Sequence, residues 1–302
     1  MSLSFAPRTL TVYVMTLSLL TWTVAAPAGA ATPSSRSPDP IVAAAGDIAC
    51  GPGDRVTSDR CHQRETANLV MSVAPNAVLA LGDLQYGGEL KDNAYDQTWG
   101  QFKSITRPVF GNHDHADDYF EYFGAAAGEP GKGYYSFNLG SWHLIALNSE
   151  CDAAGGCQAG SAQERWLAGD LAAHQNTCTL AYWHSPRYAS GHDGDNVFMS
   201  DIWQRLYAAG ADVVLSGHSH NYERFVPQDN NRNHDPKGIT QFVVGTGGAF
   251  FTGLGRLSKN SVAQNNDTFG VLKLVLHPSS YDWQFIPEDN KGFTDSGSAA
   301  CH

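Results

Sequence analysis

The sequence predicts an α/β domain built on a mixed sheet or on two packed sheets, and three observations support this class. Several short apolar runs end abruptly in polar residues that include Gly, Asp or His, as buried strands closed by tight turns do. Stretches with helical periodicity separate some of these runs, which is typical of parallel strands. Other runs follow one another with no helix between them, which indicates antiparallel neighbours.

Five runs are expected to be buried strands with polar residues at their carboxyl ends. In chain order they are Ile41–Ala45, Ala77–Leu81, Pro108–Phe110, Thr179–Trp183 and Asp212–Leu215. Further strands without intervening helices are expected at Tyr134–Leu139, Trp142–Asn148, Thr240–Val244, Phe269–Leu276 and Tyr281–Ile286. In α/β sheets the ligands lie beyond the carboxyl ends of the strands, so the polar residues at the first five ends mark a candidate site.

Three helices are expected between the strands, at Gln63–Val73, from Ser161 through Ala173, and at Val197–Ala209. The first places Ala67, Val70 and Met71 on one face, which would pack against a sheet. The second begins with Ser161-x-x-Glu164, a capping box that satisfies the first free N–H groups of a helix.

Residues 1–30 resemble a signal peptide rather than part of the fold. Arg8 precedes a largely apolar run, Thr9–Ala26, and Ala28-Gly29-Ala30 supplies the small-x-small pattern that a signal peptidase accepts. An uncleaved membrane anchor is the alternative, because the apolar run approaches spanning length. We expect a signal peptide at 1–30, a linker at 31–40, one folded domain at 41–302, and a protein that is secreted or otherwise exported.

The chain is acidic, with 19 Lys and Arg against 30 Asp and Glu. Removing residues 1–30 removes one Arg and no acid, which changes the net charge from −11 to −12. This balance argues against nucleic acid or an anionic membrane as the main partner. It does not exclude small anionic substrates, because bound metal ions can reverse the field of a site.

The six cysteines all follow residue 30. An even number of cysteines in an exported chain favours disulfides, and zinc binding is disfavoured because no CxxC spacing is present. Short separations favour pairing Cys50 with Cys61 and Cys151 with Cys157, which leaves Cys178 for Cys301. Six cysteines allow fifteen pairings, so this pairing is only the preferred one.

The polar residues at the five strand ends are Asp47, Asp83, Asn112, His184, His218 and His220. Each alone would be an ordinary turn residue or a hydrogen-bonded core histidine. Together they mix oxygen donors with imidazoles and contain no thiolate, which suits two adjacent cations such as iron, zinc or manganese. Two metal ions about 3.5–4 Å apart can clamp the attacking and leaving oxygens of a displacement at phosphorus and lower the pKa of a bound water.

Five sequence blocks resemble, in type and order, those of the calcineurin-like metallophosphoesterases, and more narrowly those of the purple acid phosphatases. They are Gly46-Asp47, Gly82-Asp83-Leu84-Gln85-Tyr86, Gly111-Asn112-His113-Asp114, Trp183-His184-Ser185-Pro186 and Gly217-His218-Ser219-His220-Asn221-Tyr222-Glu223-Arg224. The resemblance implies a four-layer αββα sandwich with two packed mixed sheets, so that residues 41–302 would be a metallophosphoesterase catalytic domain. It also implies hydrolysis of phosphate monoesters by attack of a metal-bound hydroxide at phosphorus.

The resemblance assigns seven metal ligands. Asp47, Asp83, Tyr86 and His220 would hold Fe(III), and Asp83, Asn112, His184 and His218 would hold a divalent Zn, Fe or Mn ion, with Asp83 bridging. In the family, a Tyr three residues after the bridging Asp binds ferric iron as phenolate. A phenol of pKa about 10 needs a strong Lewis acid to ionise at low pH, so the Tyr is specific for such an ion. The alternative is that Tyr86 packs in a loop.

Two further histidines match residues that act on the substrate. His113 corresponds to a family histidine that contacts the phosphoryl group or protonates the leaving oxygen. His192 resembles a second such residue, although the loop that carries it varies in length and His192 could instead be solvated. Asp114, Glu223 and Arg224 are expected to brace the ligands from behind.

Three other functions are compatible with these residues. The same centre could cleave phosphodiesters in nucleotides or phospholipid head groups, or it could bind metal without turnover, or its iron could cycle between oxidation states. The complete ligand set and His113 favour an enzyme, and the expected partner is a small phosphate ester. No membrane contact is expected after signal cleavage, and the sequence leaves the oligomeric state open.

Overall fold

The computed structural model describes residues 1–13, 38–191 and 194–302. Two units are distinguished, Met1–Ser37 and Pro38–His302. In the first unit, residues 1–13 are exposed and form neither helix nor strand. The expected cleavage pattern Ala28-Gly29-Ala30, and most of the apolar run before it, lie outside the described residues. Within the described ranges, no helix is long and apolar enough to cross a bilayer.

The second unit contains two sheets. The first consists of β1 (Ile41–Ala45), β2 (Ala77–Ala80), β3 (Thr106–Pro108), β11 (Gly270–His277), β12 (Ser280–Pro287) and β13 (Ser296–Ala300), in the order β13-β12-β11-β1-β2-β3. The second consists of β4 (Tyr135–Leu139), β5 (Trp142–Ala146), β6 (Cys178–Tyr182), β7 (Val213–Ser216), β8 (Tyr222–Phe225), β9 (Thr240–Val244) and β10 (Ser261–Asn265), in the order β10-β8-β9-β7-β6-β5-β4.

Both sheets are mixed. In the first, β1, β2 and β3 pair in parallel, whereas β11, β12 and β13 pair antiparallel. In the second, β5, β6, β7 and β9 form the parallel centre, and β4, β8 and β10 are antiparallel. The predicted pair of mixed sheets is therefore confirmed.

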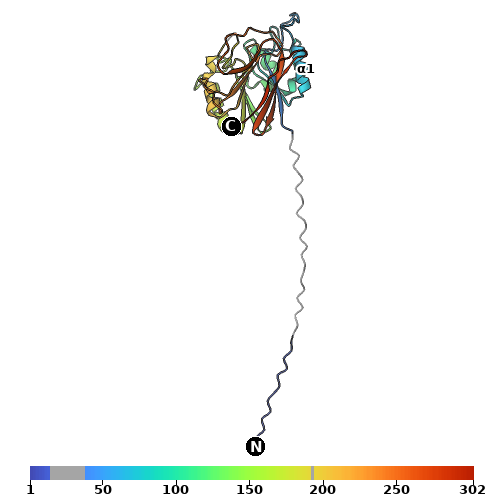
Figure 1. Ribbon diagram of the computed structural model, residues 1–302, viewed down its shortest axis with the longest axis vertical. Coiled ribbons are helices and arrows are strands. Elements are labelled where there is room, and N and C mark those ends of the chain that lie inside the picture. The colour runs from blue at the N-terminus through green and yellow to red at the C-terminus, as the bar shows by residue number, and fades with distance from the viewer. Residues whose placement is uncertain (14–37, 192–193) are drawn as a thin grey trace. The chain divides into compact units, whose positions relative to one another are not determined.

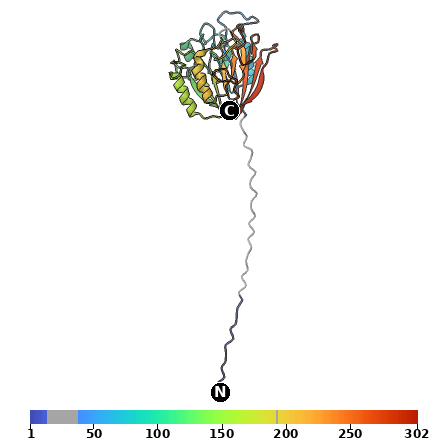
Figure 2. The same ribbon diagram turned by 60° about the vertical axis from the view of Figure 1, so that its left-hand side comes forward.

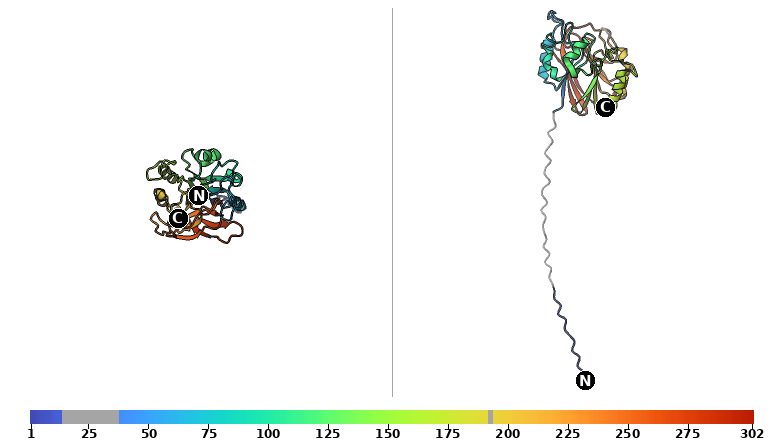
Figure 3. Two further views of the ribbon diagram at one scale, coloured as in Figure 1. Left: turned by 90° about the horizontal axis from the view of Figure 1, so that it is seen from above. Right: turned by 180° about the vertical axis from the view of Figure 1, so that it is seen from behind.

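The sheets pack face to face, and helices cover their outer faces. Leu144 and Leu180 of the second sheet lie in the core between the sheets, while their neighbours Ile145 and Ala181 face the opposite side. This alternation follows from the two-residue period of a strand and gives four layers. Figures 1 and 3 show α1 (Gln63–Val73) on one flank, and Figure 2 shows α3 (Ala162–Ala173) and α4 (Ser200–Ala208) on the other.

The helices agree closely with the sequence prediction. α1 has the expected bounds, and Ala67 and Val70 are buried. At the start of α3, Ser161 Oγ accepts a hydrogen bond from the N–H of Glu164, but the Glu164 carboxylate accepts one from Gly160 rather than from Ser161. The predicted helix from Val197 begins as a 3-10 turn, η3 (Val197–Met199), and is α-helical from Ser200.

Several elements were not expected from the sequence. They are α2 (Ala116–Phe123), the 3-10 helices η1 (Trp99–Ile105) and η2 (Gly124–Ala127), the inner strand β8, and the edge strands β10 and β13. The third strand also begins earlier than predicted, because Thr106 and Arg107 already pair with β2. Val109 remains buried and still donates its N–H to the carbonyl of Ala80, so the apolar run identified the element but not its start.

The disulfides are the three that the spacing favoured, Cys50–Cys61, Cys151–Cys157 and Cys178–Cys301. The last joins β6 of the second sheet to the residue that follows β13 of the first. It therefore links the two sheets covalently near their amino-terminal edge.

Candidate metal centre

The predicted ligands follow strands of both sheets. Asp47, Asp83 and Asn112 come after β1, β2 and β3 of the first sheet, whereas His184 and the His218-Ser219-His220 segment come after β6 and β7 of the second. Backbone hydrogen bonds join the ends of the two sheets here, because Gly46 N–H donates to the carbonyl of Val244 at 2.9 Å. Ligands from distant parts of the chain therefore meet at one end of the sandwich.

One set of donor atoms surrounds the phenol oxygen of Tyr86. This oxygen lies 3.0 Å from Asp47 Oδ1, 2.9 Å from Asp83 Oδ2 and 2.8 Å from His220 Nε2. His220 Nδ1 donates to the carbonyl of Phe250 at 2.6 Å, so its Nε2 presents a lone pair. A single phenol proton cannot satisfy three acceptors.

A second set surrounds Nε2 of His184. This nitrogen lies 3.1 Å from Asn112 Oδ1, 3.3 Å from Asp83 Oδ1 and 3.3 Å from His218 Nδ1. His218 Nδ1 is also 2.9 Å from Asn112 Oδ1. Because His184 Nδ1 donates to the carbonyl of Leu81 at 2.8 Å, its Nε2 also presents a lone pair.

Asp83 belongs to both sets. Its Oδ2 faces Tyr86 and its Oδ1 faces His184, with the carboxylate almost completely buried between them. A carboxylate that divides its two oxygens in this way has the geometry required of a bridging ligand. The arrangement thus fits the two-ion assignment that the sequence implied.

The donor sets also fit metal ions in spacing and in charge. Ligands about 2.1 Å from a tetrahedral or octahedral ion lie roughly 3.0–3.4 Å from one another, close to the separations in both sets. Burial would lower the pKa of His184, but the charge of Asp83 and its hydrogen bond outweigh this effect and raise the pKa to about 10. The surroundings therefore favour positive charge at His184, and a metal ion in place of that proton would meet the same need.

The phenol of Tyr86 is held in a field that opposes its ionisation. Burial raises its pKa, and the charges of Asp47 and Asp83 raise it further, far above the ordinary value. The phenol therefore keeps its proton unless a strongly Lewis-acidic cation displaces it.

Comparison with known proteins identifies the family. Residues 42–222 match the family model described as calcineurin-like phosphoesterase. The chain belongs to this family. It is 30% identical to purple acid phosphatase 18 of Arabidopsis thaliana over 195 residues, which are 55% of this chain and 42% of that protein. It is 29% identical to probable purple acid phosphatase 20 of the same plant over 228 residues, which are 65% of this chain and 50% of that protein.

A solved structure supports the same fold. The purple acid phosphatase PPD1 from yellow lupin seeds superimposes with a TM-score of 0.69 at 19% identity, covering 88% of this chain and 54% of that one. The chain spans about half the length, or less, of the curated relatives that it matches. Within the calcineurin-like phosphoesterases, the chain resembles the purple acid phosphatases, and it has the αββα fold that its motifs implied.

Three of the predicted ligands have a backbone φ angle that is uncommon for residues other than glycine. Asp47, Asp83 and His218 all have positive φ, of 58°, 49° and 67°. Such conformations disfavour side chains with a Cβ and persist at functional sites because the surroundings impose them. Gly111 is required for a related reason, because a Cβ there would lie 2.3 Å from Asp83 Oδ1.

The glycine-rich segment 245–248 lies against the centre. A Cβ on Gly245 would lie 2.1 Å from the carbonyl oxygen of Ser219 and 2.9 Å from Asp47 Oδ2. This close approach allows the backbone after β9 to support the first donor set. The only sequence signal was the density of glycine after a buried strand.

The two predicted substrate-facing histidines differ in what the structure describes. The His113 ring is exposed, and its centroid lies 4.8 Å from that of Tyr86, so it borders the first donor set on its open side. The N–H of His113 also donates to Asp83 Oδ1 at 2.9 Å. His192 lies outside the described residues, and its role stays a prediction.

The three expected bracing residues take different positions. Asp114 accepts hydrogen bonds from the N–H groups of Asp83, Leu84 and Gly111. Burial, followed by the charge of Asp83, raises the pKa of Asp114 to about 7. Glu223 instead holds the loop before residue 192, by accepting from the N–H and the hydroxyl of Ser190.

Arg224 lies farther from the centre than expected. Its guanidinium pairs with Asp295 at 2.7 and 3.0 Å and lies over the ring of Trp283. These contacts stabilise the outer part of β8 against β12. Arg224 thus supports the fold rather than a ligand directly.

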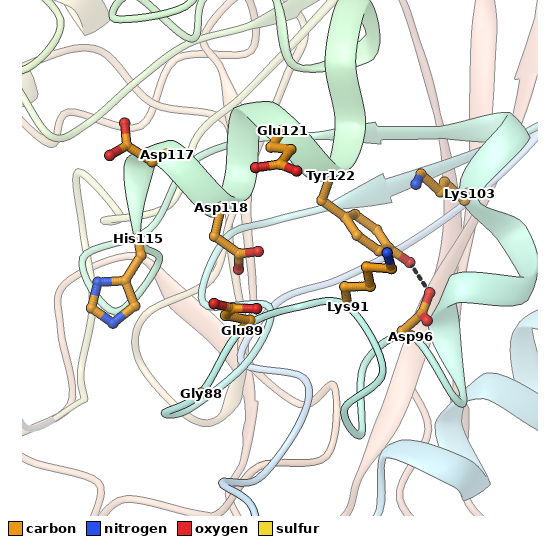
Figure 4. Close-up of a pocket in the computed structure, with 10 residues that line it drawn as sticks. All are labelled: Gly88, Glu89, Lys91, Asp96, Lys103, His115, Asp117, Asp118, Glu121 and Tyr122. Atoms are coloured by element: carbon orange, nitrogen blue, oxygen red, sulfur yellow. Dashed lines mark hydrogen bonds between the residues drawn. The ribbon is translucent and has the colours of Figure 1, made fainter.

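Two hollows differ in their relation to the centre. A cavity of about 480 Å³ includes Asn112 in its lining. A larger groove of about 850 Å³ lies between α2 and the segment after Gly88, and Figure 4 shows its acidic side chains, among them Glu89, Asp118 and Glu121. No predicted ligand lines this groove, whereas Asn112 lines the smaller cavity.

Proposed function

We propose that this chain is an exported phosphatase that hydrolyses phosphate monoesters with Fe(III) and a divalent zinc, iron or manganese ion. Asp47, Asp83, Tyr86 and His220 would hold the ferric ion. Asp83, Asn112, His184 and His218 would hold the divalent ion. Once bound, the two ions would polarise the phosphate ester and lower the pKa of a coordinated water.

The observation that carries the proposal is the division of the Asp83 carboxylate between the two lone-pair sets. A structural carboxylate at this depth would need hydrogen-bond donors on both oxygens. Oδ1 accepts the N–H of His113, but Oδ2 has only the Tyr86 hydroxyl, whose single proton is also within reach of Asp47 Oδ1 and His220 Nε2. This arrangement is costly without cations and favourable with them.

The residues of the chain also position and protonate the substrate. Asn112 and His113 lie on the exposed side of the centre, where a phosphate ester would approach. His113 would contact the phosphoryl group or protonate the leaving oxygen, and His192 would be a second residue of this kind. The buried imidazoles, with their Nδ1 atoms fixed by carbonyl groups, would keep the opposite side rigid.

Export is supported by the disulfides and by the signal-like N-terminus. Three disulfides and no free cysteine are typical of oxidising compartments. The expected substrate is a small phosphate ester rather than nucleic acid, because the surface is acidic.

The test is metal analysis together with hydrolysis of an aryl phosphate by the purified mature protein. We expect two ions per chain and turnover in the wild type, and loss of both properties in Asp83→Asn, which keeps the shape but removes the bridging charge. Asp289→Asn, at an exposed position, is the matched control. A wild-type protein that holds two ions but does not cleave a phosphate ester would refute the proposed activity.

A further inference from the structure

The cavity beside Asn112 has a distinct chemical character. It is lined by Phe110, Glu150, Asp152 and Phe198 in addition to Asn112. Since Asn112 is a predicted ligand, an ester whose phosphate lies at the centre can extend its leaving alcohol into this cavity. The residues that line it would then contact the leaving group rather than the phosphate.

Glu150 is the residue that gives the cavity its charge. Its carboxylate is half-buried and makes no hydrogen bond or ion pair within residues 38–191 and 194–302. Burial raises its pKa, and the nearby charges that act on it are those of His184 and Asp83. A partly desolvated carboxylate with no cationic partner is available to a ligand.

The loop that carries Glu150 is rigid. The Cys151–Cys157 disulfide closes it, and the Gln163 side chain holds its start by accepting from the N–H of Asn148 at 2.7 Å and donating to the Asn148 carbonyl at 2.8 Å. Asn148 Oδ1 in turn accepts the N–H of Glu150 at 2.9 Å. The backbone that carries Glu150 is therefore held in place before any ligand binds, which lowers the entropy cost of recognition.

Aromatic rings complete the cavity. Phe110 is almost buried, but Phe198 is 44% exposed and presents its ring to the cavity that Glu150 and Asp152 also line. Ring faces attract cations, and rings combined with carboxylates recognise ammonium groups in particular. The same carboxylates would repel an anionic group that entered the cavity.

We propose that this cavity receives the leaving alcohol of the substrate, and that Glu150 and Phe198 select an alcohol with an ammonium group over one with a carboxylate. This inference rests on the proposed phosphatase function and adds a substrate class to it. The preferred substrates are monoesters of amino alcohols, and the disfavoured ones carry a second anionic group.

The experiment compares three aliphatic monoesters whose alcohols are cationic, neutral and anionic: choline phosphate, glycerol phosphate and phosphoglycerate. We expect the wild-type kcat/KM to fall in that order. In Glu150→Gln, the ratio of choline phosphate to phosphoglycerate should drop on the order of tenfold, mainly through KM, as expected for one partly screened charge pair. Glu65→Gln, which removes one charge from an exposed position of α1, should leave the ratio unchanged.

A second variant separates the contribution of the aromatic ring face of Phe198 from the contribution of its apolar size. Phe198→Leu keeps the hydrophobic size but removes the ring face, so it should lower kcat/KM for choline phosphate more than for glycerol phosphate. Equal effects on both esters, or an unchanged ratio in Glu150→Gln, would overturn the inference while hydrolysis of the esters continued. Failure to hydrolyse even para-nitrophenyl phosphate would instead overturn the proposed function on which it rests.

Discussion

Asp114 holds the backbone of Asp83, because its Oδ2 accepts the N–H of Asp83 at 3.0 Å. The same oxygen accepts the N–H of Gly111 at 2.9 Å, one residue before Asn112. A single carboxylate thus joins the turn after β2 to the turn after β3, and these turns carry Asp83, the predicted bridging ligand, and Asn112, a predicted ligand of the divalent ion. The distance between the two turns depends on this side chain.

We therefore expect Asp114→Asn to weaken metal binding without unfolding the protein. An amide keeps one acceptor oxygen but replaces the other with a donor, which cannot accept the N–H groups that the carboxylate accepts. Loss of such a supporting group typically lowers metal affinity or activity about 10–100-fold. Metal titration followed by activity should show the change, and Asp117→Asn, at an exposed position in the first turn of α2, should not.

Tyr86→Phe tests the ferric assignment. Electron transfer from a phenolate to Fe(III) gives a broad visible absorption, so the native protein should be coloured and the variant colourless. The ring would keep its packing against Phe250, so stability should change little. Tyr207→Phe, which removes a hydroxyl bonded to Asp235, is the control. A colourless native protein with two zinc or manganese ions would contradict the iron assignment but not the two-metal site.

Asn112→Ala and His184→Ala should lower the metal content towards one ion per chain. The second donor set contains a neutral amide and no phenol, so it should hold its ion more weakly than the first. Most activity should be lost with that ion. Either variant with two ions and normal turnover would show that the ligand assignment is wrong.

His113→Ala should lose activity while keeping both metal ions. A positioned general acid contributes about 10²–10⁴-fold in rate. The loss should be smaller for esters whose leaving group is already good, because protonation matters less for them. Rate constants measured across a series of aryl and alkyl phosphates would show whether the loss depends on the pKa of the leaving group. An equal loss across the series would indicate that His113 acts as an electrostatic contact instead.

Removing the Cys178–Cys301 disulfide should destabilise the domain. The bridge spans 123 residues and joins the two sheets. Loops of this length correspond to about 4–5 kcal/mol in the chain-entropy model. Denaturant unfolding of the Cys178→Ser, Cys301→Ser double variant should show the loss, whereas the short Cys151–Cys157 loop should contribute less. Mass measurement with and without reduction should show a gain of six protons in the wild type.

The sequence predicted the elements that bury apolar runs and the motifs at their ends. β1, β9 and α1 have the expected bounds, because apolar periodicity and turn residues agree there. β13 was missed because Ser296–Ala300 is an exposed edge strand of small residues, held by pairing with β12 rather than by burial. α2 was missed although Tyr119, Tyr122 and Phe123 are buried at helical spacing, a local signal that the sequence prediction did not use.

The candidate site was predictable in composition but not in geometry. Motif order suggested Asp83 and His184 as partners, yet the approach of Gly245 to Ser219 arises only from the packing of distant segments. The outward position of Arg224 likewise depends on Asp295, which is 71 residues away in the chain. Side chains adjacent to a ligand in sequence need not support that ligand.

The contribution of both sheets to the centre has a consequence for assembly of the protein. The predicted oxygen ligands follow strands of the first sheet, and the three predicted histidine ligands follow strands of the second. Neither sheet by itself carries a complete set of the proposed ligands. An ion with all its ligands would therefore be bound only after the two sheets have packed together. Bound metal would then stabilise the packed state of the two sheets by mass action. The fraction of molecules that contain metal would therefore equal or fall below the fraction that has folded completely.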